Sequence, residues 1–204
     1  MKGPGEHCCR TSGRSVIGID EVGRGCLAGH VTAAAVWFPS LRFPDDVDDS
    51  KKVPESKRDA LAYAIRQHAV VAVGHASVAE IDKHGIHKAT YMAMTRAWFM
   101  LPAPRDALVI IDGIEKPEGI DAEMLCLKGA DATCPSVAAA SIIAKVDRDQ
   151  AMRVLAGDND IYSWKSNKGY GSKVHMAALA EHGPGPHHRH SFRPVRIAAR
   201  ERNS

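Results

Sequence analysis

The chain has 204 residues, of which 45% are hydrophobic and 25% are charged, and its formal net charge is +3. This length suits one medium-sized domain with a real hydrophobic core. A run of about eighteen apolar residues, which would predict a membrane-spanning helix, does not occur. Residues 1–14 are polar and lack the apolar stretch of a signal peptide. The mild positive charge is compatible with a polyanionic partner but does not require one.

The five cysteines contain no Cys-x-x-Cys pair and are odd in number, which indicates free thiols in a reducing compartment. We therefore expect a cytoplasmic protein without a membrane partner. Cys8 and Cys9 beside His7 suggest zinc ligands, but no second ligand pair follows at a usable spacing. A flexible N-terminal tail over residues 1–14 is the preferred interpretation.

The first part of the chain predicts three strands and one helix. Short apolar runs at residues 15–20 and 30–38 predict a hairpin-type pair of strands, separated by the glycine-containing loop of residues 21–29. Apolar residues at helical spacing predict a helix at residues 54–68, and a third apolar run predicts a strand at residues 69–77.

The middle of the chain continues this alternation. Residues 78–101 predict a helix that is broken near Gly85, and residues 107–112 and 124–127 predict two further strands. Residues 135–155 predict a long alanine-rich helix, whose small side chains allow a very close approach to the sheet.

The last part predicts less regular structure. Residues 158–171 predict a loop, residues 172–182 a final helix, and residues 183–193 a Gly/Pro/His-rich tail. Apolar strands separated by helices indicate an α/β domain with a mixed sheet. We expect residues 15–157 to form the catalytic domain, and residues 158–204 to form a C-terminal helical portion and tail packed on it.

Four acidic residues lie at the ends of apolar segments. Asp20 and Glu21 lie where the first predicted strand meets the glycine loop, Asp112 ends a later strand, and Asp131 precedes the alanine-rich helix. Because functional groups in open α/β sheets gather outside strand ends, these carboxylates can converge on one spot. An isolated Asp at a strand end more often caps a turn, but that interpretation does not account for the adjacent acids Asp20 and Glu21.

Clustered carboxylates repel one another, and hard cations relieve that repulsion. Mg²⁺ and Mn²⁺ favour oxygen ligands of this kind. Two such ions about 4 Å apart can activate a water and stabilise the leaving oxygen in phosphodiester hydrolysis. The acids alone therefore predict a metal or acid–base site and select no substrate.

Several ordered segments resemble the type 2 ribonuclease H family, and within it the bacterial ribonuclease HII branch. The segment at residues 18–29 (GIDEVGRGCLAG) is similar to the family signature with its DE(A/V)GRG core. The further similar segments are 49–52 (DSKK), 81–90, 111–113 (IDG), 128–131 (KGAD), 138–146 (AAASIIAKV), 167–173 (NKGYGSK) with His175, and 188–195 (HRHSFRPV). The resemblance covers residues 15–195.

The resemblance implies a ribonuclease H-like fold, with a five-stranded mixed sheet flanked by helices and a small C-terminal helical portion. It implies an endonuclease that hydrolyses the RNA strand of RNA–DNA hybrids. The enzyme would also cleave 5′ to single ribonucleotides embedded in duplex DNA, leaving 3′-hydroxyl and 5′-phosphate ends. Its cofactor would be Mn²⁺ or Mg²⁺, with two ions during catalysis. A monomer is the default expectation.

The resemblance also implies roles for individual residues. Asp20, Glu21 and Asp112 would bind metal, and Asp131 would be the fourth catalytic acid.

Gly23, Arg24 and Gly25 would recognise the RNA–DNA junction, because glycines let the backbone approach a ribose whose 2′-hydroxyl distinguishes RNA from DNA. Tyr170 would stack on the sugar of the deoxynucleotide that follows the ribonucleotide. An aromatic side chain packed under a glycine loop is the alternative interpretation of Tyr170.

Basic residues in the similar segments are candidate phosphate contacts, which would add affinity rather than specificity. They are Lys51, Lys145, Lys168, Lys173 and Arg189. For each of them a solvated surface position is an equal alternative. The histidines at 187, 188 and 190 are expected in a loop or at a phosphate, and His175 is expected to be structural.

Some residues depart from the family pattern. Cys26 and His30 stand where the family commonly has prolines, and Gly85 stands where it usually has Asn. Asp147 and Asp149 lie near the acids in sequence, and we expect them to make capping or i,i+4 pairs instead.

Three alternatives remain open at this point. Another nuclease or strand transferase of ribonuclease H-like fold, such as a junction resolvase, would share the acids but not the GRG and GYG segments. A type 3 ribonuclease H would carry an extra N-terminal domain, which residues 1–14 cannot form. An inert nucleic-acid-binding protein would not be expected to retain every acid.

Overall fold

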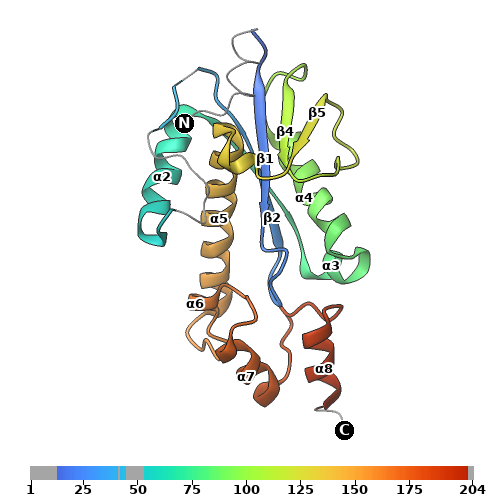
Figure 1. Ribbon diagram of the computed structural model, residues 1–204. Helices are drawn as coiled ribbons and strands as arrows, with labels where there is room; N and C mark the ends of the chain where they lie inside the picture. The colour runs from blue at the N-terminus through green and yellow to red at the C-terminus, as the bar shows by residue number, and fades with distance from the viewer. Residues whose placement is uncertain (1–12, 41, 45–52, 202–204) are drawn as a thin grey trace.

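A five-stranded mixed sheet forms the centre of the molecule (Figure 1). The computed structural model describes residues 13–40, 42–44 and 53–201. The strands are β1 (Val16–Val22), β2 (Val31–Trp37), β3 (Val70–Ala76), β4 (Leu108–Asp112) and β5 (Met124–Leu127), in the order β3-β2-β1-β4-β5. The β1–β2 and β2–β3 pairs are antiparallel, and the β1–β4 and β4–β5 pairs are parallel. The expected five-stranded mixed sheet and the hairpin-type pair are confirmed.

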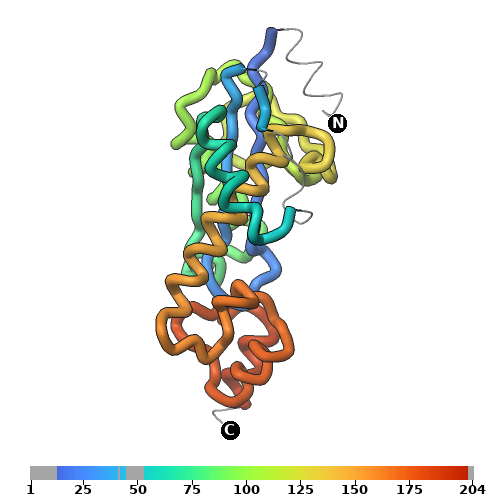
Figure 2. The backbone as a smooth tube through the Cα atoms, turned by 90° about the vertical axis from the view of Figure 1, so that its left-hand side faces the viewer, coloured from blue at the N-terminus to red at the C-terminus, as the bar shows by residue number. Residues whose placement is uncertain are grey.

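Helices cover both faces of the sheet. The long helix α5 (Pro135–Ala156) and helix α2 (Glu55–His68) lie on one face, whereas α3 (Val78–His84) and α4 (Ile86–Met100) lie on the other (Figures 1 and 2). Gly85 separates α3 from α4, as the sequence predicts, and adopts a φ of 81° that glycine tolerates. None of the described helices is long and apolar enough to cross a membrane.

Alternation along the strands sends apolar side chains into two cores. Ile17 and Ile19 of β1 pack with α4, while Ala34 and Val36 of β2 face the opposite side and pack with Ile142 of α5. Successive side chains of a strand point to opposite faces, so the apolar runs of the central strands are buried on both sides.

The C-terminal part departs from its prediction in two places. Helix α7 (Lys173–His182) lies where it is expected, but α6 (Trp164–Asn167) interrupts the predicted loop and α8 (Arg193–Glu201) follows the predicted tail. Val195 is the one buried residue of α8. With Phe192 and Ala198 it forms a short apolar stripe at helical spacing that packs on Leu27 and Leu179, a stripe that the prediction from sequence does not assign to a helix. Helices α6, α7 and α8 lie together beyond the C-terminal end of α5, at one end of the molecule (Figures 1 and 2).

Helix α5 makes its closest approach to the sheet at Gly18 of β1. A Cβ atom at this position would lie 2.2 Å from the backbone carbon of Ser136 and 2.3 Å from the backbone nitrogen of Val137. No side chain fits there unless the helix moves. The small residues Ala139 and Ala140 extend this tight contact along α5, as the alanine-rich segment predicts.

We expect Gly18→Ala to lower the free energy of unfolding by about 1–3 kcal/mol, the usual cost of overpacking a core. Urea unfolding measures the effect. Gly25→Ala is the matched control, because a Cβ at Gly25 meets no atom within 4 Å. Equal stability of the two variants would contradict the tight contact.

Candidate active site

Three carboxylates meet at one end of the two central parallel strands. Asp20 lies on β1 and Asp112 ends β4, in a register that pairs Ile19 with Ile111. Asp131 lies in the short 3-10 helix η1 (Ala130–Ala132), directly before α5. Each side chain offers an oxygen within 4.8 Å of the oxygens of the other two. Asp20 and Asp131 are buried, and Asp112 is half-buried.

Backbone amides hold one oxygen of two of these acids. The N–H groups of Gly129 and Ala130 donate to Oδ1 of Asp112, at 2.7 and 3.1 Å, and the N–H of Glu21 donates to Oδ1 of Asp20 at 2.7 Å. Gly129 has a φ of 74°, a left-handed conformation that suits glycine. These hydrogen bonds fix the orientation of each carboxylate and leave a second oxygen for another partner.

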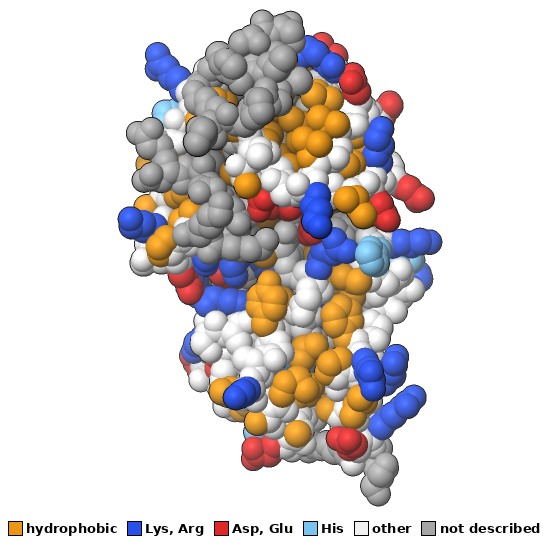
Figure 3. All heavy atoms as spheres, viewed as in Figure 1, with side chains coloured by type: hydrophobic (Ala, Val, Ile, Leu, Met, Phe, Trp, Pro, Cys, Tyr) orange, Lys and Arg blue, Asp and Glu red, His pale blue; other side chains and the backbone are white. Residues whose placement is uncertain are grey.

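Glu21 is next to the three acids but points to the other side of β1. Its Oε1 accepts a hydrogen bond from Arg24 at 3.2 Å, and Arg24 in turn contacts Nδ1 of His87 at 3.2 Å. Glu21, Arg24 and Asp112 line a common hollow of about 360 Å³ together with Lys128. Figure 3 shows acidic and basic side chains meeting near the middle of this face of the molecule.

Burial and mutual repulsion act on the acids. Burial raises the pKa of Asp20 well above its usual value, and the charges of Glu21, Asp112 and Asp131 raise it further. Burial also raises the pKa of Glu21, which the hydrogen bond and charge of Arg24 partly offset. An added cation would relieve this strain, and the all-oxygen donor set is the type that hard divalent ions prefer.

Two fully buried arginines fix the loop of residues 23–30, which we call the GRG loop after its first three residues. Arg189 donates to the carbonyl oxygens of Gly23, Arg24 and Gly29 at 2.7 to 2.9 Å. Arg148 of α5 donates to the carbonyl oxygens of Ala28, His30 and Lys168 at 2.8 to 3.1 Å, and is also fully buried. A Cβ at Gly23 would lie 2.0 Å from Nε of Arg148, so glycine is required beside this guanidinium.

The GYG segment packs directly on the GRG loop. The N–H of Leu27 donates to the carbonyl of Gly169 at 2.8 Å, and a Cβ at Gly169 would lie 2.7 Å from the carbonyl oxygen of Ala28. Tyr170 is 42% exposed, and its side chain interacts with the buried Cys26. The tyrosine therefore stands beside the loop with part of its ring open to a ligand.

The basic residues proposed as phosphate contacts occupy different environments. Arg189 is fully buried among carbonyls, so the expected phosphate contact is wrong for it. Lys168 is buried and pairs with Glu55 at 3.1 Å, while Lys145 pairs with Asp149 at 2.6 Å in the i,i+4 arrangement expected for that acid. Lys173 is exposed, and Lys51 lies outside the described residues.

The histidine-rich tail is also partly internal. His188 is fully buried and lies 3.0 Å from the buried His175, between their Nε2 atoms. Trp164 donates to Nε2 of His175 at 3.3 Å. His175 thus occupies the structural position expected of it. His188 lies in the expected loop, but its buried ring excludes a phosphate contact. The polar character of the neighbouring sequence did not indicate that the His188 ring would be buried.

The sheet order β3-β2-β1-β4-β5, with helices on both faces, is that of the ribonuclease H-like fold. The family model for ribonuclease HII matches residues 17–195. Ribonuclease HII of Cereibacter sphaeroides is 48% identical over 180 residues, which cover 88% of this chain and 84% of that protein. The chain belongs to the ribonuclease HII family and is a hydrolytic nuclease of the ribonuclease H type.

Solved structures agree with this fold. The ribonuclease H2 of Pyrococcus horikoshii superposes with a TM-score of 0.81 at 23% identity, covering 93% of this chain and 99% of that one. Bst-RNase HIII, solved in complex with Mn²⁺, superposes with a TM-score of 0.73 at 21% identity, covering 92% of this chain and 70% of that one.

The raised pKa of Asp20 predicts a pH-dependent stability of the metal-free protein. The folded state holds the Asp20 proton more tightly than the unfolded state, so stability falls as pH rises from about 4 through the raised pKa. Asp20→Asn removes the ionisable group and keeps an oxygen for the Glu21 amide.

In chelator, we expect Asp20→Asn to raise the Tm above that of the wild type at pH 7.5. The advantage should be lost below about pH 4, where the wild-type Asp20 is protonated in both the folded and the unfolded state. Differential scanning calorimetry measures the shift. The exposed Asp121→Asn is the control. A lower Tm for Asp20→Asn at pH 7.5 would contradict the repulsion described above.

Proposed function

We propose that the chain hydrolyses the RNA strand of RNA–DNA hybrids and cleaves 5′ to single ribonucleotides in duplex DNA, by two-metal-ion phosphodiester hydrolysis. The products would carry 3′-hydroxyl and 5′-phosphate ends. The observation that carries the proposal is the group of Asp20, Asp112 and Asp131 oxygens within 4.8 Å of one another, beside the GRG loop of a ribonuclease HII family member.

The donor set fits hard divalent ions. Asp20, Asp112 and Asp131 supply only carboxylate oxygens, and Glu21 borders the same hollow as Asp112. In this proposal Asp20, Glu21 and Asp112 hold the ions and Asp131 completes the catalytic set. Bound Mn²⁺ or Mg²⁺ would supply Lewis-acid stabilisation of the scissile phosphate and activation of the attacking water. The Mn²⁺ complex of Bst-RNase HIII supports the choice of ion class.

The other residues of the site position the substrate. The buried guanidinium of Arg189 holds the carbonyls of Gly23 and Arg24, so the loop is rigid before the substrate binds. In the proposal Gly23, Arg24 and Gly25 recognise the ribose 2′-hydroxyl, and Tyr170 stacks on the next deoxyribose.

The same two arginines support the proposed division of the chain. Arg148 of α5 and Arg189 of the C-terminal part both bind the GRG loop. Residues 158–204 would thus complete the substrate site of a catalytic domain at residues 15–157, in a protein that works as a monomer. A reducing, cytoplasmic setting is part of the proposal and rests on the cysteine pattern of the sequence.

Asp112→Asn tests the catalytic assignment. Metal-assisted catalysis of this kind supplies several kcal/mol, so we expect the variant to cleave a duplex containing one ribonucleotide about 100-fold more slowly or worse. The assay uses Mn²⁺ or Mg²⁺, with chelator as the blank. The control is Asp106→Asn, which changes an exposed acid just before the same strand. Cleavage that is unchanged in Asp112→Asn would overturn the proposal.

Tyr170→Ala tests the junction assignment. Loss of the apolar contact between the ring and the sugar, about 1–2 kcal/mol, predicts a reduction of about 5- to 30-fold in kcat/KM on duplex DNA with one embedded ribonucleotide. Tyr170→Phe should retain most of the activity, because the ring remains. Tyr63→Ala, at an exposed position of α2, serves as the control. An equal loss in Tyr170→Phe would indicate that the hydroxyl group, not stacking, matters.

A further inference from the structure

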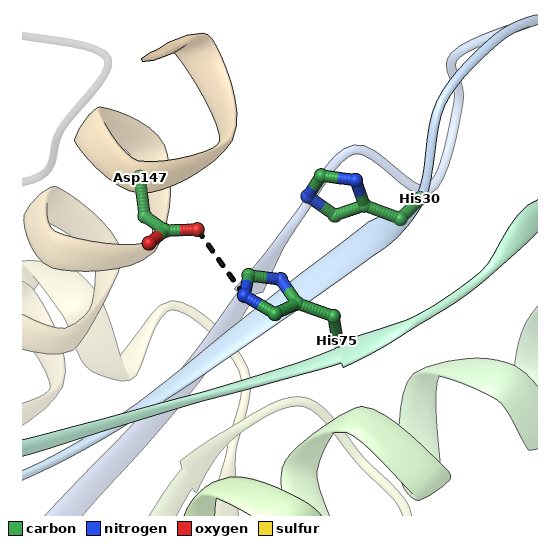
Figure 4. Close-up of side chains that lie close together, drawn as sticks. All are labelled: His30, His75 and Asp147. Atoms are coloured by element: carbon green, nitrogen blue, oxygen red, sulfur yellow. Dashed lines mark ion pairs between the residues drawn. The ribbon is translucent and has the colours of Figure 1, made fainter. Parts of the chain in front are cut away.

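Two histidines and one aspartate form a second candidate ligand cluster on the α5 face of the sheet. His30 directly precedes β2, His75 lies on β3, and Asp147 lies on α5. Each offers a ligand atom within 4.8 Å of the others. Figure 4 shows the three side chains turned toward one another, between the helix and the strands. The cluster shares no residue with the acids of the candidate active site.

The strand register explains why the two histidines meet. Thr32 of β2 pairs with His75 of β3, and residues two apart on a strand share a face, so His30, Thr32 and His75 lie on the same side of the sheet. Asp147 faces them from α5, and the group lines a hollow of about 430 Å³. The two rings contact each other edge to face, with centroids 4.7 Å apart.

Each histidine presents a nitrogen that suits a metal. Nε2 of His30 is buried and has no hydrogen-bond partner within the described part of the chain, an arrangement that costs free energy unless something binds it. Burial also lowers the pKa of His30 to about 4, which leaves the ring neutral. Nδ1 of His75 contacts the hydroxyl of Thr32 at 3.2 Å, which leaves Nε2 of His75 facing Asp147.

The distance between His75 and Asp147 fits two ligands of one tetrahedral ion better than a hydrogen bond. Nε2 of His75 and Oδ2 of Asp147 are 3.5 Å apart, beyond the usual hydrogen-bond range. Two ligands that each lie about 2.1 Å from a tetrahedral Zn²⁺ are about 3.4 Å apart. Because Asp147 and His75 are partly exposed, a small rotation of either side chain would bring the set to coordination distance.

We propose that His30, His75 and Asp147 bind a divalent transition-metal ion, Zn²⁺ by ligand chemistry, which ties α5 to β2 and β3. Two imidazoles and one carboxylate suit such an ion, and three protein ligands leave a fourth position for water from the hollow. The hydroxyl of Thr32 orients His75 as the outer partner of a metal-bound imidazole usually does. The chain would then hold two classes of metal at separate sites, with hard ions at the acids and zinc at the histidines.

The decisive experiment is a calorimetric titration of the full chain with Zn²⁺ in excess Mg²⁺, which keeps the acids of the candidate active site occupied. We expect one zinc ion per chain. Asp147→Asn and His75→Gln should each weaken zinc binding by about 10-fold or more, whereas Asp112→Asn should not. The exposed residues Asp158 and His68 provide matched controls, as Asp158→Asn and His68→Gln.

Two further readouts do not depend on activity. Co²⁺ in place of Zn²⁺ should give the visible absorption of a four-coordinate nitrogen–oxygen site, and Thr32→Val should weaken binding by about 10-fold because the outer hydrogen bond is lost. Zinc binding that survives in Asp147→Asn and His75→Gln, or that disappears in Asp112→Asn, would overturn the proposal. The pair His75–Asp147 would then be a simple ion pair with His30 packed against it.

Discussion

The contact between α5 and β1 at Gly18 is the constraint on which the candidate active site depends. No side chain separates the helix from the strand there, because a Cβ would lie 2.2 Å from the backbone of Ser136. The start of α5 is therefore held against the sheet, and η1, which directly precedes it, carries Asp131 to within reach of Asp20. Register between β1 and β4 then brings Asp112 to the same point. The close packing of the alanine-rich helix α5 on Gly18 thus helps to bring the three carboxylates together.

Buried acids and buried arginines near the candidate active site differ in how their charges are compensated. The acids lie close to one another, and burial and repulsion raise the pKa of Asp20, so a bound cation would relieve the repulsion. The arginines Arg148 and Arg189 are buried as well, but backbone carbonyls surround their guanidinium groups. A buried charge is tolerated when its hydrogen-bonding capacity is met. The arginines thus order the GRG loop, and the acids stay available for ligands.

Much of the fold was predictable from the sequence for a physical reason. The central strands β1, β2 and β4 are apolar runs that are buried on both faces, and the outer strands β3 and β5 also lie where apolar runs predict them. The acids were predictable as a group because strand ends are easy to locate. Helix α8 was not predicted, because its apolar stripe of Phe192, Val195 and Ala198 is short and stands among basic residues next to a Gly/Pro/His-rich segment.

Contacts between distant segments could not be predicted. Arg189 was expected at a phosphate, because nothing in a basic tail indicates that its guanidinium reaches back to Gly23 across the sequence. Nothing in the sequence around Arg148 indicates that its guanidinium is buried. The only trace is Gly23, which must be glycine because a Cβ there would clash with Arg148. Asp147 was expected to make a capping or i,i+4 pair, whereas it faces His75 on β3. Contacts of this kind between distant segments depend on strand register and on the rotation of each helix about its axis, which sequence patterns predict only approximately.

The central claim is that Asp20, Asp112 and Asp131 form the site of hard divalent ions. An anomalous difference map from crystals grown with Mn²⁺ tests it most directly. The account predicts a strong Mn²⁺ peak within about 2.0–2.3 Å of carboxylate oxygens from these three residues, and its absence in crystals of Asp112→Asn. Mn²⁺ bound elsewhere on the wild-type chain, with these carboxylates making no contact to it, would contradict the account.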